Sequence, residues 1–279
     1  MTPRSYLYVP ADQEDRLAKA AGRGADALIL DLEDAVAPGA KAAARKNAAA
    51  AIPELPGEVW VRVNADTPEA DIAAVAVPGL KGIVVPKAEP ALLELADALL
   101  TEAETVRDLA PGTFALLALI ESASGVVQAE RVAASPRVVR LGVGEADLAG
   151  ELGLRPGPER EELWPIRSRI VVASAAAGIL PPVGPVETAV RDTEALLAGT
   201  RTLLRQGFRA RTALSPRQLP LINEVFTPSP EELEEARDLV RRLAETGGVA
   251  LDARGRFIDA AVARSAHEVI GRAEGAAPP

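Results

Sequence analysis

The sequence predicts a (βα)8 barrel (a TIM barrel) followed by a C-terminal helical extension. Short apolar segments, among them A-L-I-L, G-I-V-V and A-L-L-A-L-I, alternate with longer amphipathic segments. This alternation is typical of parallel β/α units, whose strands become almost continuously apolar because helices cover the sheet. Eight such units in about 215 residues match a closed barrel. An open doubly wound sheet is the alternative, but V-P-A-D-Q-E-D replaces the glycine fingerprint expected after its first strand.

Each strand is predicted from a short apolar run that ends at turn residues or charges. The predicted strands are Ser5–Pro10, Ala27–Glu33, Val59–Asn64, Gly82–Lys87, Phe114–Glu121, Val138–Glu145, Pro181–Val186 and Arg211–Ser215. The helical patterns cover residues 12–23, 41–51, 68–76, 90–108, 125–134, 158–178 and 192–206. Asp12 is expected to cap the first of these helices.

The C-terminal part of the chain has a more charged character. A helix is predicted over Thr227–Glu245, with Ser229 as its N-cap and Glu232 three residues later as the second half of a capping box. A further helical pattern covers Phe257–Ala273. We therefore expect residues 1–226 to form the barrel and catalytic domain. Residues 227–279 are expected to form an extension that packs on the barrel or contacts a neighbouring subunit.

Composition excludes several classes of protein. Hydrophobic residues make up 48% of the 279 residues and charged residues 25%, which indicates a globular chain. The net charge of −9 disfavours nucleic acid and anionic membranes as partners. The absence of cysteine and the single histidine, His267, exclude thiolate chemistry and multi-histidine zinc sites. Neither a signal peptide nor a long apolar segment is recognised, so the expected location is the cytoplasm.

Charged residues follow most predicted strands, at the end where barrels carry their function. Asp31 and Glu33 are two positions apart, so both point to one side of the second strand. Glu121 and Asp147 follow neighbouring strands, about 4.8 Å apart, where two carboxylates repel unless a cation lies between them. Oxygen ligands suit magnesium, calcium or manganese. We therefore expect a metal, most simply Mg²⁺, at Glu121 and Asp147.

Several other residues are candidates for substrate binding. Arg62 offers a guanidinium fork for a substrate carboxylate. Asp34 and Lys87 follow the second and fourth strands, and Arg211 and Arg217 belong to a basic cluster near the eighth, where barrels often bind phosphate. For each acidic residue the alternative is a helix cap or a structural ion pair, and for the basic cluster it is a solvated surface.

Taken together, the motifs resemble those of citrate lyase β-subunit-like proteins, the CoA-ester lyases of the HpcH/HpaI aldolase family. The resemblance runs from R-S-Y-L-Y-V-P-A to about residue 272. It rests on L-D-L-E-D-A-V, V-R-V-N, V-V-P-K-A-E, A-L-I-E-S-A-S-G-V, G-V-G-E-A-D-L-A and N-E-V-F-T-P-S-P-E-E. Many relatives read G-F-x-G-K-x-x-I-H-P-x-Q at the eighth strand, where this chain instead has Ala210, Arg211 and Ser215. Ser215 and Gln218 are nevertheless spaced as a capping box.

The resemblance implies a barrel that assembles into trimers or hexamers and binds Mg²⁺, with Mn²⁺ as an alternative, at Glu121 and Asp147. It implies that Arg62 binds a keto acid and that Asp259 acts as acid or base in a neighbouring subunit's site. Asp31 and Glu33 are further candidates for proton transfer.

The expected reaction is Mg²⁺-dependent cleavage, or formation, of a 3-hydroxyacyl-CoA such as malyl-CoA or citramalyl-CoA. The expected small-molecule partners are therefore a keto acid and an acyl-CoA thioester. One alternative is a metal-dependent aldolase that acts on free keto acids, and another is a malate-synthase-like or thioesterase-like activity. A non-enzymatic alternative is an inactive barrel that serves as a binding or assembly subunit.

Overall fold

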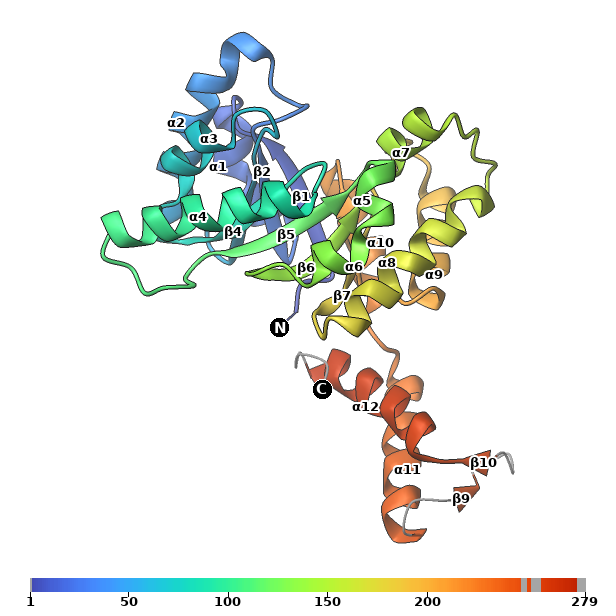
Figure 1. The fold of residues 1–279 in the computed structure, drawn as a ribbon. Helices are drawn as coiled ribbons and strands as arrows, with labels where there is room; N and C mark the ends of the chain where they lie inside the picture. The colour runs from blue at the N-terminus through green and yellow to red at the C-terminus, as the bar shows by residue number, and fades with distance from the viewer. Residues whose placement is uncertain (1, 247–249, 252–256, 275–279) are drawn as a thin grey trace. The chain divides into compact units, whose positions relative to one another are not determined.

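The computed structural model describes residues 2–246, 250–251 and 257–274 of the chain. It divides into two compact units, one formed by Arg4–Asn223 and the other by Met1–Pro3 with Glu224–Pro279 (Figure 1). Among the described helices, none is both long and apolar enough to cross a lipid bilayer.

The larger unit is a closed barrel of eight parallel strands in sequence order. The strands are β1 Ser5–Pro10, β2 Ala27–Asp31, β3 Glu58–Arg62, β4 Leu80–Val85, β5 Ala115–Ile120, β6 Val138–Val143, β7 Leu180–Gly184 and β8 Ala210–Ala213. Because β1 pairs with both β2 and β8, the barrel is confirmed and the open doubly wound sheet is excluded.

Helices follow the strands along the chain, as the alternating pattern predicts. They are α1 Glu14–Ala20, α2 Lys41–Ala51, α3 Pro68–Val75, α4 Pro90–Val106, α5 Ala123–Val127, α6 Ala129–Ala133, α7 Glu145–Leu152, α8 Trp164–Ala176 and α9 Thr193–Arg205. Short 3-10 helices are η1 Ala21–Arg23, η2 Pro38–Ala40, η3 Ile52–Glu54, η4 Glu161–Leu163 and η5 Pro216–Gln218. Figure 1 shows α2, α3 and α4 side by side on one flank of the barrel, where each packs on the next.

Some predicted boundaries are wrong, and the errors matter for the site. β2 ends at Asp31 and β6 at Val143, each two residues before the predicted end. Glu145 begins α7, a helix that the sequence pattern did not predict. The predicted helix over residues 158–178 begins only at Trp164, because the backbone of Arg160 is left-handed with φ of 52° and ends any helical run there.

The capping predictions have mixed outcomes. The Ser215 hydroxyl accepts from the Arg217 N–H, and the Gln218 side chain accepts from the Ser215 N–H, so the predicted capping box is confirmed at η5. The prediction for α1 is wrong, because Gln13 rather than Asp12 occupies the N-cap and makes no side-chain cap hydrogen bond.

The barrel interior is closely packed with apolar side chains from alternate strand positions. Tyr6, Ile29 and Trp60 belong to one buried cluster of such side chains. A Cβ on Gly82 would lie only 2.1 Å from the Ala115 carbonyl oxygen, so β4 and β5 approach each other too closely for any larger residue. Because this interior is filled, polar function is confined to the strand ends and the loops that follow them.

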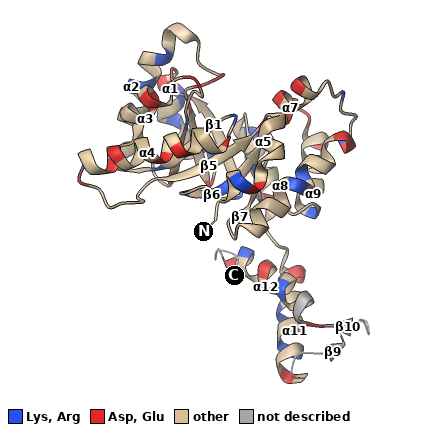
Figure 2. Cartoon of the chain, in the orientation of Figure 1, with Lys and Arg blue, Asp and Glu red and all other residues tan. Residues whose placement is uncertain are grey.

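The second unit is built mainly from two helices. Helix α10 Leu219–Phe226 leads from one unit into the other and is followed by α11 Pro230–Thr246, β9 Ala250–Leu251, β10 Phe257–Ile258 and α12 Ala260–Glu274. The predicted capping box of α11 is confirmed, since Ser229 and Glu232 exchange hydrogen bonds between side chain and backbone. Helices α11 and α12 pack together, and Figure 2 shows both acidic and basic residues along α11.

Candidate active site

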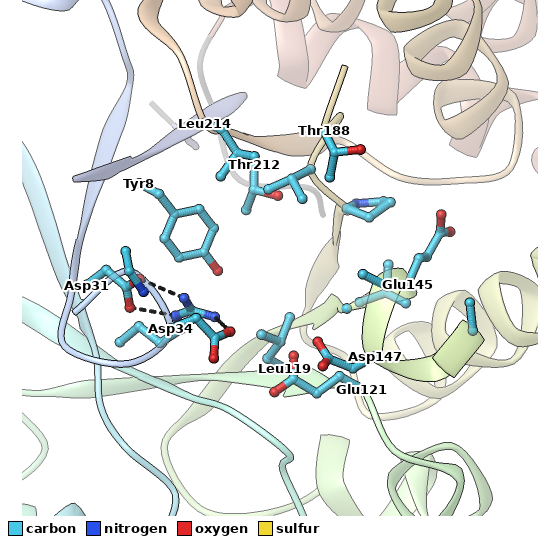
Figure 3. Close-up of a pocket in the computed structure, with 18 of the residues that line it drawn as sticks. Tyr8, Asp31, Asp34, Leu119, Glu121, Glu145, Asp147, Thr188, Thr212 and Leu214 are labelled. Atoms are coloured by element: carbon cyan, nitrogen blue, oxygen red, sulfur yellow. Dashed lines mark hydrogen bonds and ion pairs between the residues drawn. The ribbon is translucent and has the colours of Figure 1, made fainter. Parts of the chain in front are cut away.

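The carboxyl ends of the barrel strands surround a cavity of about 690 Å³. Asp31 and Arg62 line it from the last positions of β2 and β3, where they are partners in the strand register. Glu121 lines it directly after β5, and Asp147 lines it from the first turn of α7 (Figure 3). The structure therefore brings together the residues that strand-end position predicted.

The guanidinium of Arg62 is held by several carboxylates. Its Nε and Nη2 donate to the two oxygens of Asp31 at 2.7 Å each, and its Nη1 lies 3.2 Å from an Asp34 oxygen. The guanidinium also lies over the Tyr8 ring at 4.9 Å. Burial would lower the pKa of Arg62, but hydrogen bonds to Asp31 raise it above its ordinary value. Arg62 is therefore a fixed cation that lines the cavity, with the Nε and Nη2 edge of its guanidinium occupied by Asp31.

Asp31 and Glu33 differ in what they are free to do. Asp31 is almost fully buried and also accepts the backbone N–H groups of Glu33 and Ala35, so its two oxygens are fully occupied by these groups and by Arg62. Glu33 lies 2.9 Å from Arg62 Nη1, yet its Oε2 has no well-aligned hydrogen bond. Burial raises the pKa of Glu33 to about 7 despite the nearby arginine. Glu33 contacts Arg62 but is not among the residues that line the cavity.

Glu121 and Asp147 form a pair of neighbouring carboxylates in the cavity. Figure 3 shows their oxygens next to each other. Glu121 is buried, and one of its oxygens accepts the backbone N–H of Lys87 at 2.9 Å. Burial raises the pKa of Glu121 to about 7, and repulsion from Asp147 adds to the shift. A buried carboxylate that holds its proton this firmly is one that a cation would stabilise in the charged form.

Gly144 leaves the room that Glu121 occupies. Ile120 and Val143 are register partners, so the residues that follow them, Glu121 and Gly144, lie side by side. A Cβ on Gly144 would lie 2.5 Å from Glu121 Oε2 and 2.6 Å from Glu121 Cβ. A glycine is required here because of this contact, and not because of its backbone, whose φ is −100°.

The donor set fits Mg²⁺. Within the described residues, no group of three or more histidine, aspartate or glutamate side chains is placed to hold a metal ion, so the pair Glu121 and Asp147 is the candidate in this cavity. Mg²⁺ is typically bound by one or two carboxylates, with water and substrate oxygens completing its octahedron. Glu121 and Asp147 supply that number of carboxylates.

Three other predicted site residues, Lys87, Arg211 and Asp259, lie in three different settings. Lys87 has an exposed side chain and serves the site through its backbone N–H. Arg211 is not brought to the cavity: its buried guanidinium donates to Pro185 O and Thr200 Oγ1, and burial lowers its pKa to about 10. Asp259 belongs to the second unit, where its Oδ1 accepts the Val262 N–H at the start of α12.

A second hollow of about 640 Å³ adjoins the first. The basic residues that line it come from the α1 region and from η5, and they are Arg16, Lys19, Arg23 and Arg217. Four residues line both hollows, namely Tyr8, Pro10, Arg16 and Leu214. The two hollows are therefore adjacent along β1 and the end of β8.

The sequence analysis did not single out Tyr8 or Arg160, which both line the cavity. Tyr8 precedes Pro10 at the end of β1, and the only signal was its place at a strand end. Arg160 lines the cavity from the loop after α7, in a stretch that was predicted to be helical. The run R-P-G-P, which ends at Pro158, was the turn signal that marks this loop.

Comparison with known proteins agrees with this arrangement. The sequence pattern described as HpcH/HpaI aldolase/citrate lyase matches residues 4–216. The citrate lyase subunit beta of Leuconostoc mesenteroides subsp. cremoris is 31% identical over 278 residues, which cover 96% of this chain and 92% of that protein. A (3S)-malyl-CoA thioesterase of Cereibacter sphaeroides is 36% identical over 248 residues, which cover 87% of this chain and 83% of that protein. The CitE protein of Mycobacterium tuberculosis, solved with magnesium, acetoacetate and coenzyme A, superimposes with a TM-score of 0.75 at 30% identity and covers 97% of this chain and 98% of that one.

Proposed function

This chain belongs to the HpcH/HpaI aldolase/citrate lyase family, and from that premise we propose that it is a Mg²⁺-dependent carbon–carbon lyase. Its substrate would be a 3-hydroxyacyl-CoA of the malyl-CoA or citramalyl-CoA class, which it cleaves to a keto acid and an acyl-CoA, or forms from them. The observation that carries the proposal is the pair Glu121 and Asp147 beside the fixed guanidinium of Arg62 in one cavity. The complex of CitE with magnesium, acetoacetate and coenzyme A supports the same ligand set.

Glu121 and Asp147 would hold the metal, which supplies Lewis-acid stabilisation of the oxygen that becomes the keto group. Arg62 lines the cavity as a fixed cation and orients the substrate carboxylate there. Cleavage removes the proton of the 3-hydroxyl, breaks the C2–C3 bond and leaves an enolate of the thioester. Protonation of that enolate carbon completes the acyl-CoA, so one acid/base group balances both proton transfers.

We assign this acid/base role to Asp259 acting from a neighbouring copy of the chain, in a trimer or hexamer. Two features support it. Asp31 is unsuited to proton transfer because Arg62 and two backbone N–H groups occupy it, and Glu33 does not line the cavity. Asp259 is half-buried and is presented at the N-terminus of α12. Asp259→Asn should lower kcat strongly and leave Mg²⁺ affinity unchanged.

The second hollow suits the coenzyme portion of the thioester. Its four basic residues complement phosphates, and its shared wall allows a long ligand to pass from one hollow to the other. This assignment gives Arg217 a role in substrate binding, as its position after β8 predicted. Arg217→Gln should therefore raise KM for a CoA ester and leave the affinity for a free keto acid unchanged.

The first experiment measures keto-acid release from malyl-CoA and citramalyl-CoA with and without Mg²⁺. Glu121→Gln, which keeps the shape of the side chain, should abolish release, whereas the matched control Glu130→Gln on α6 should not, since Glu130 is exposed and its nearest cation is 3.8 Å away. Turnover that persists without metal, or in Glu121→Gln, contradicts the proposal.

Thioester hydrolysis is the second candidate, because the (3S)-malyl-CoA thioesterase is 36% identical to this chain. The two reactions differ in their products. A lyase releases keto acid with the thioester intact, and a thioesterase releases free thiol without keto acid. Parallel detection of both products in the same reaction decides between them.

A further inference from the structure

The two tyrosines of the chain, Tyr6 and Tyr8, both lie on β1. They are two positions apart, so they point to the same side of the strand. Each ring lies beside an arginine: the guanidinium carbon of Arg140 is 5.6 Å from the ring centre of Tyr6, and that of Arg62 is 4.9 Å from the ring centre of Tyr8. Their hydroxyl groups differ. The Tyr6 hydroxyl accepts a hydrogen bond from Arg140 Nη1 at 3.1 Å, whereas the Tyr8 hydroxyl has no hydrogen-bond partner among the residues that the structure describes.

The side chain of Tyr8 lines the cavity that holds the candidate metal ligands. It is half-buried and packs against the core cluster that contains Tyr6, and Figure 3 shows its ring extending into the cavity with the hydroxyl oxygen at the inner end. A tyrosine hydroxyl in such a position normally has a partner, because a polar group withdrawn from water without a hydrogen bond is costly. The Tyr8 hydroxyl is therefore a donor that is available to a ligand in the cavity.

Tyr8 also lies where the two hollows meet. It is one of the four residues of the wall that the hollows share, together with Pro10, Arg16 and Leu214. The candidate metal ligands line only the first hollow, and three of the four basic residues assigned to the coenzyme line only the second. A substrate with its keto-acid portion at the metal and its coenzyme in the second hollow must therefore carry its thioester carbonyl past Tyr8.

The other residues of the shared wall are less suited to receive that carbonyl. Pro10 has no N–H, and the Leu214 N–H donates to Gln218 Oε1 at 2.9 Å. The side chain of Arg16 is exposed, so water competes for its hydrogen bonds and screens its charge. Tyr8 is the member of this wall whose donor is half-buried and carried by a barrel strand.

The Tyr8 hydroxyl is suited to donate a hydrogen bond rather than its proton. Burial raises the pKa of Tyr8 well above its usual value, and the nearby Arg62 offsets only part of that shift. The hydroxyl is therefore neutral at physiological pH. Because β1 pairs with both β2 and β8, the donor is fixed before the substrate arrives, which is the condition for strong stabilisation of a developing oxyanion.

We propose that Tyr8 is a further catalytic residue, whose hydroxyl donates a hydrogen bond to the thioester carbonyl oxygen and stabilises the enolate. The inference rests on the proposed function for the position of the thioester. In cleavage, the 3-hydroxyl gives its proton to the acid/base group, and the electron pair left on oxygen forms the keto C=O as the C2–C3 bond breaks. The electron pair of that bond moves into the thioester, where negative charge develops on the carbonyl oxygen beside Tyr8. The acid/base group then returns the proton to C2, and Tyr8 keeps its own.

The first test is Tyr8→Phe, which removes the hydroxyl and keeps the ring beside Arg62. The kcat for cleavage of a CoA ester should fall about 100-fold with Mg²⁺ affinity unchanged, because removal of one oxyanion donor costs about 10²- to 10³-fold in kcat. Tyr6→Phe is the matched control, since it removes the same atom from the same strand. It should lower the free energy of unfolding, because Arg140 loses a hydrogen bond, and leave kcat unchanged. Wild-type kcat in Tyr8→Phe would overturn the catalytic role.

The second test detects the hydrogen bond without turnover. Acetyl-CoA labelled with ¹³C at the thioester carbonyl is bound to the Mg²⁺-loaded full-length protein, and its carbonyl signal is recorded by NMR. A hydrogen bond to the carbonyl oxygen moves this signal downfield, so it should lie further downfield in the wild type and in Tyr6→Phe than in Tyr8→Phe.

The outcomes separate this proposal from the proposed function. Equal carbonyl shifts in the wild type and in Tyr8→Phe would overturn the hydrogen bond, even if kcat falls. A wild type that does not bind acetyl-CoA would overturn both the hydrogen bond and the placement of the coenzyme. A downfield shift that Tyr8→Phe removes, in a protein that cleaves no CoA ester, would overturn the proposed function and leave the hydrogen bond intact.

Discussion

Replacement of Gly144 by alanine tests whether Glu121 is the metal ligand through a residue that carries no functional group. The added Cβ would lie 2.6 Å from Glu121 Cβ and 2.5 Å from its Oε2. Carbon atoms in contact prefer about 3.5–4.0 Å, so the glutamate must retreat by about 1 Å. Helix α7 begins immediately after Gly144, so the glycine has little freedom to move away instead.

The expected effect on metal binding is large compared with the effect on folding. Mg²⁺ requires oxygen ligands at about 2.0–2.1 Å in near-octahedral geometry, so a displacement of about 1 Å removes one carboxylate ligand. Disturbing the support of a metal ligand typically costs about 10- to 100-fold in affinity or activity. Overpacking should cost about 1–3 kcal/mol of stability. The φ of −100° is open to alanine, so no backbone strain is added.

Mg²⁺ affinity is measured by isothermal titration calorimetry, and the free energy of unfolding is measured by urea unfolding of the same samples. Gly150→Ala is the matched control, since it lies within the same helix, is exposed, and has open space where its Cβ would be. That variant should bind Mg²⁺ as the wild type does and gain up to about 1 kcal/mol of stability. Wild-type Mg²⁺ affinity in a folded Gly144→Ala protein would refute the assignment of Glu121 as a ligand.

Two further predictions concern the charged groups of the barrel. The Mg²⁺-free protein should be more stable near pH 5.5 than near pH 8.5, because the pKa of Glu33 and of Glu121 is raised from 4.5 to about 7 in the fold. The stability that each raised pKa contributes is complete below about pH 4.5 and is lost as the pH rises through 7. Between pH 5.5 and pH 8.5 the loss is on the order of 2 kcal/mol per group. Urea unfolding should show a smaller loss of stability over this pH range in Glu33→Gln than in the wild type. Arg137→Ala should cost about 3 kcal/mol in the same assay with Mg²⁺ affinity unchanged, because the buried Glu104 loses the arginine that outweighs its burial and holds its pKa near 2. A free energy of unfolding within error of the wild type would contradict the second prediction.

The barrel and the core of the site could be predicted because both follow from strand periodicity. A charge that follows an apolar strand must lie at the rim, and for that reason Arg62, Glu121 and Asp147 were found. What periodicity cannot give is the partner of each side chain. Arg211, the first residue of the predicted eighth strand, was grouped with the basic cluster near that strand, but its guanidinium turns into a buried network. The sequence pattern did not reveal Arg160 because it predicted a helix there. The left-handed backbone of Arg160 makes this stretch a loop instead.

The charge distribution of the cavity joins these observations into one binding scheme. On one side, three carboxylates pair with the single guanidinium of Arg62, and Glu121 and Asp147 add two more in the same cavity, so this side repels an acidic substrate until a divalent cation and retained protons reduce its charge. On the other side, Arg160, Arg167 and Arg211 pair with only two glutamates, Glu145 and Glu187. The two sides of the cavity therefore differ in charge balance: carboxylates outnumber the cation around Arg62, and arginines outnumber the carboxylates around Arg160. An acidic substrate group is repelled at the first side until the metal is bound, so metal binding should precede productive binding of the substrate.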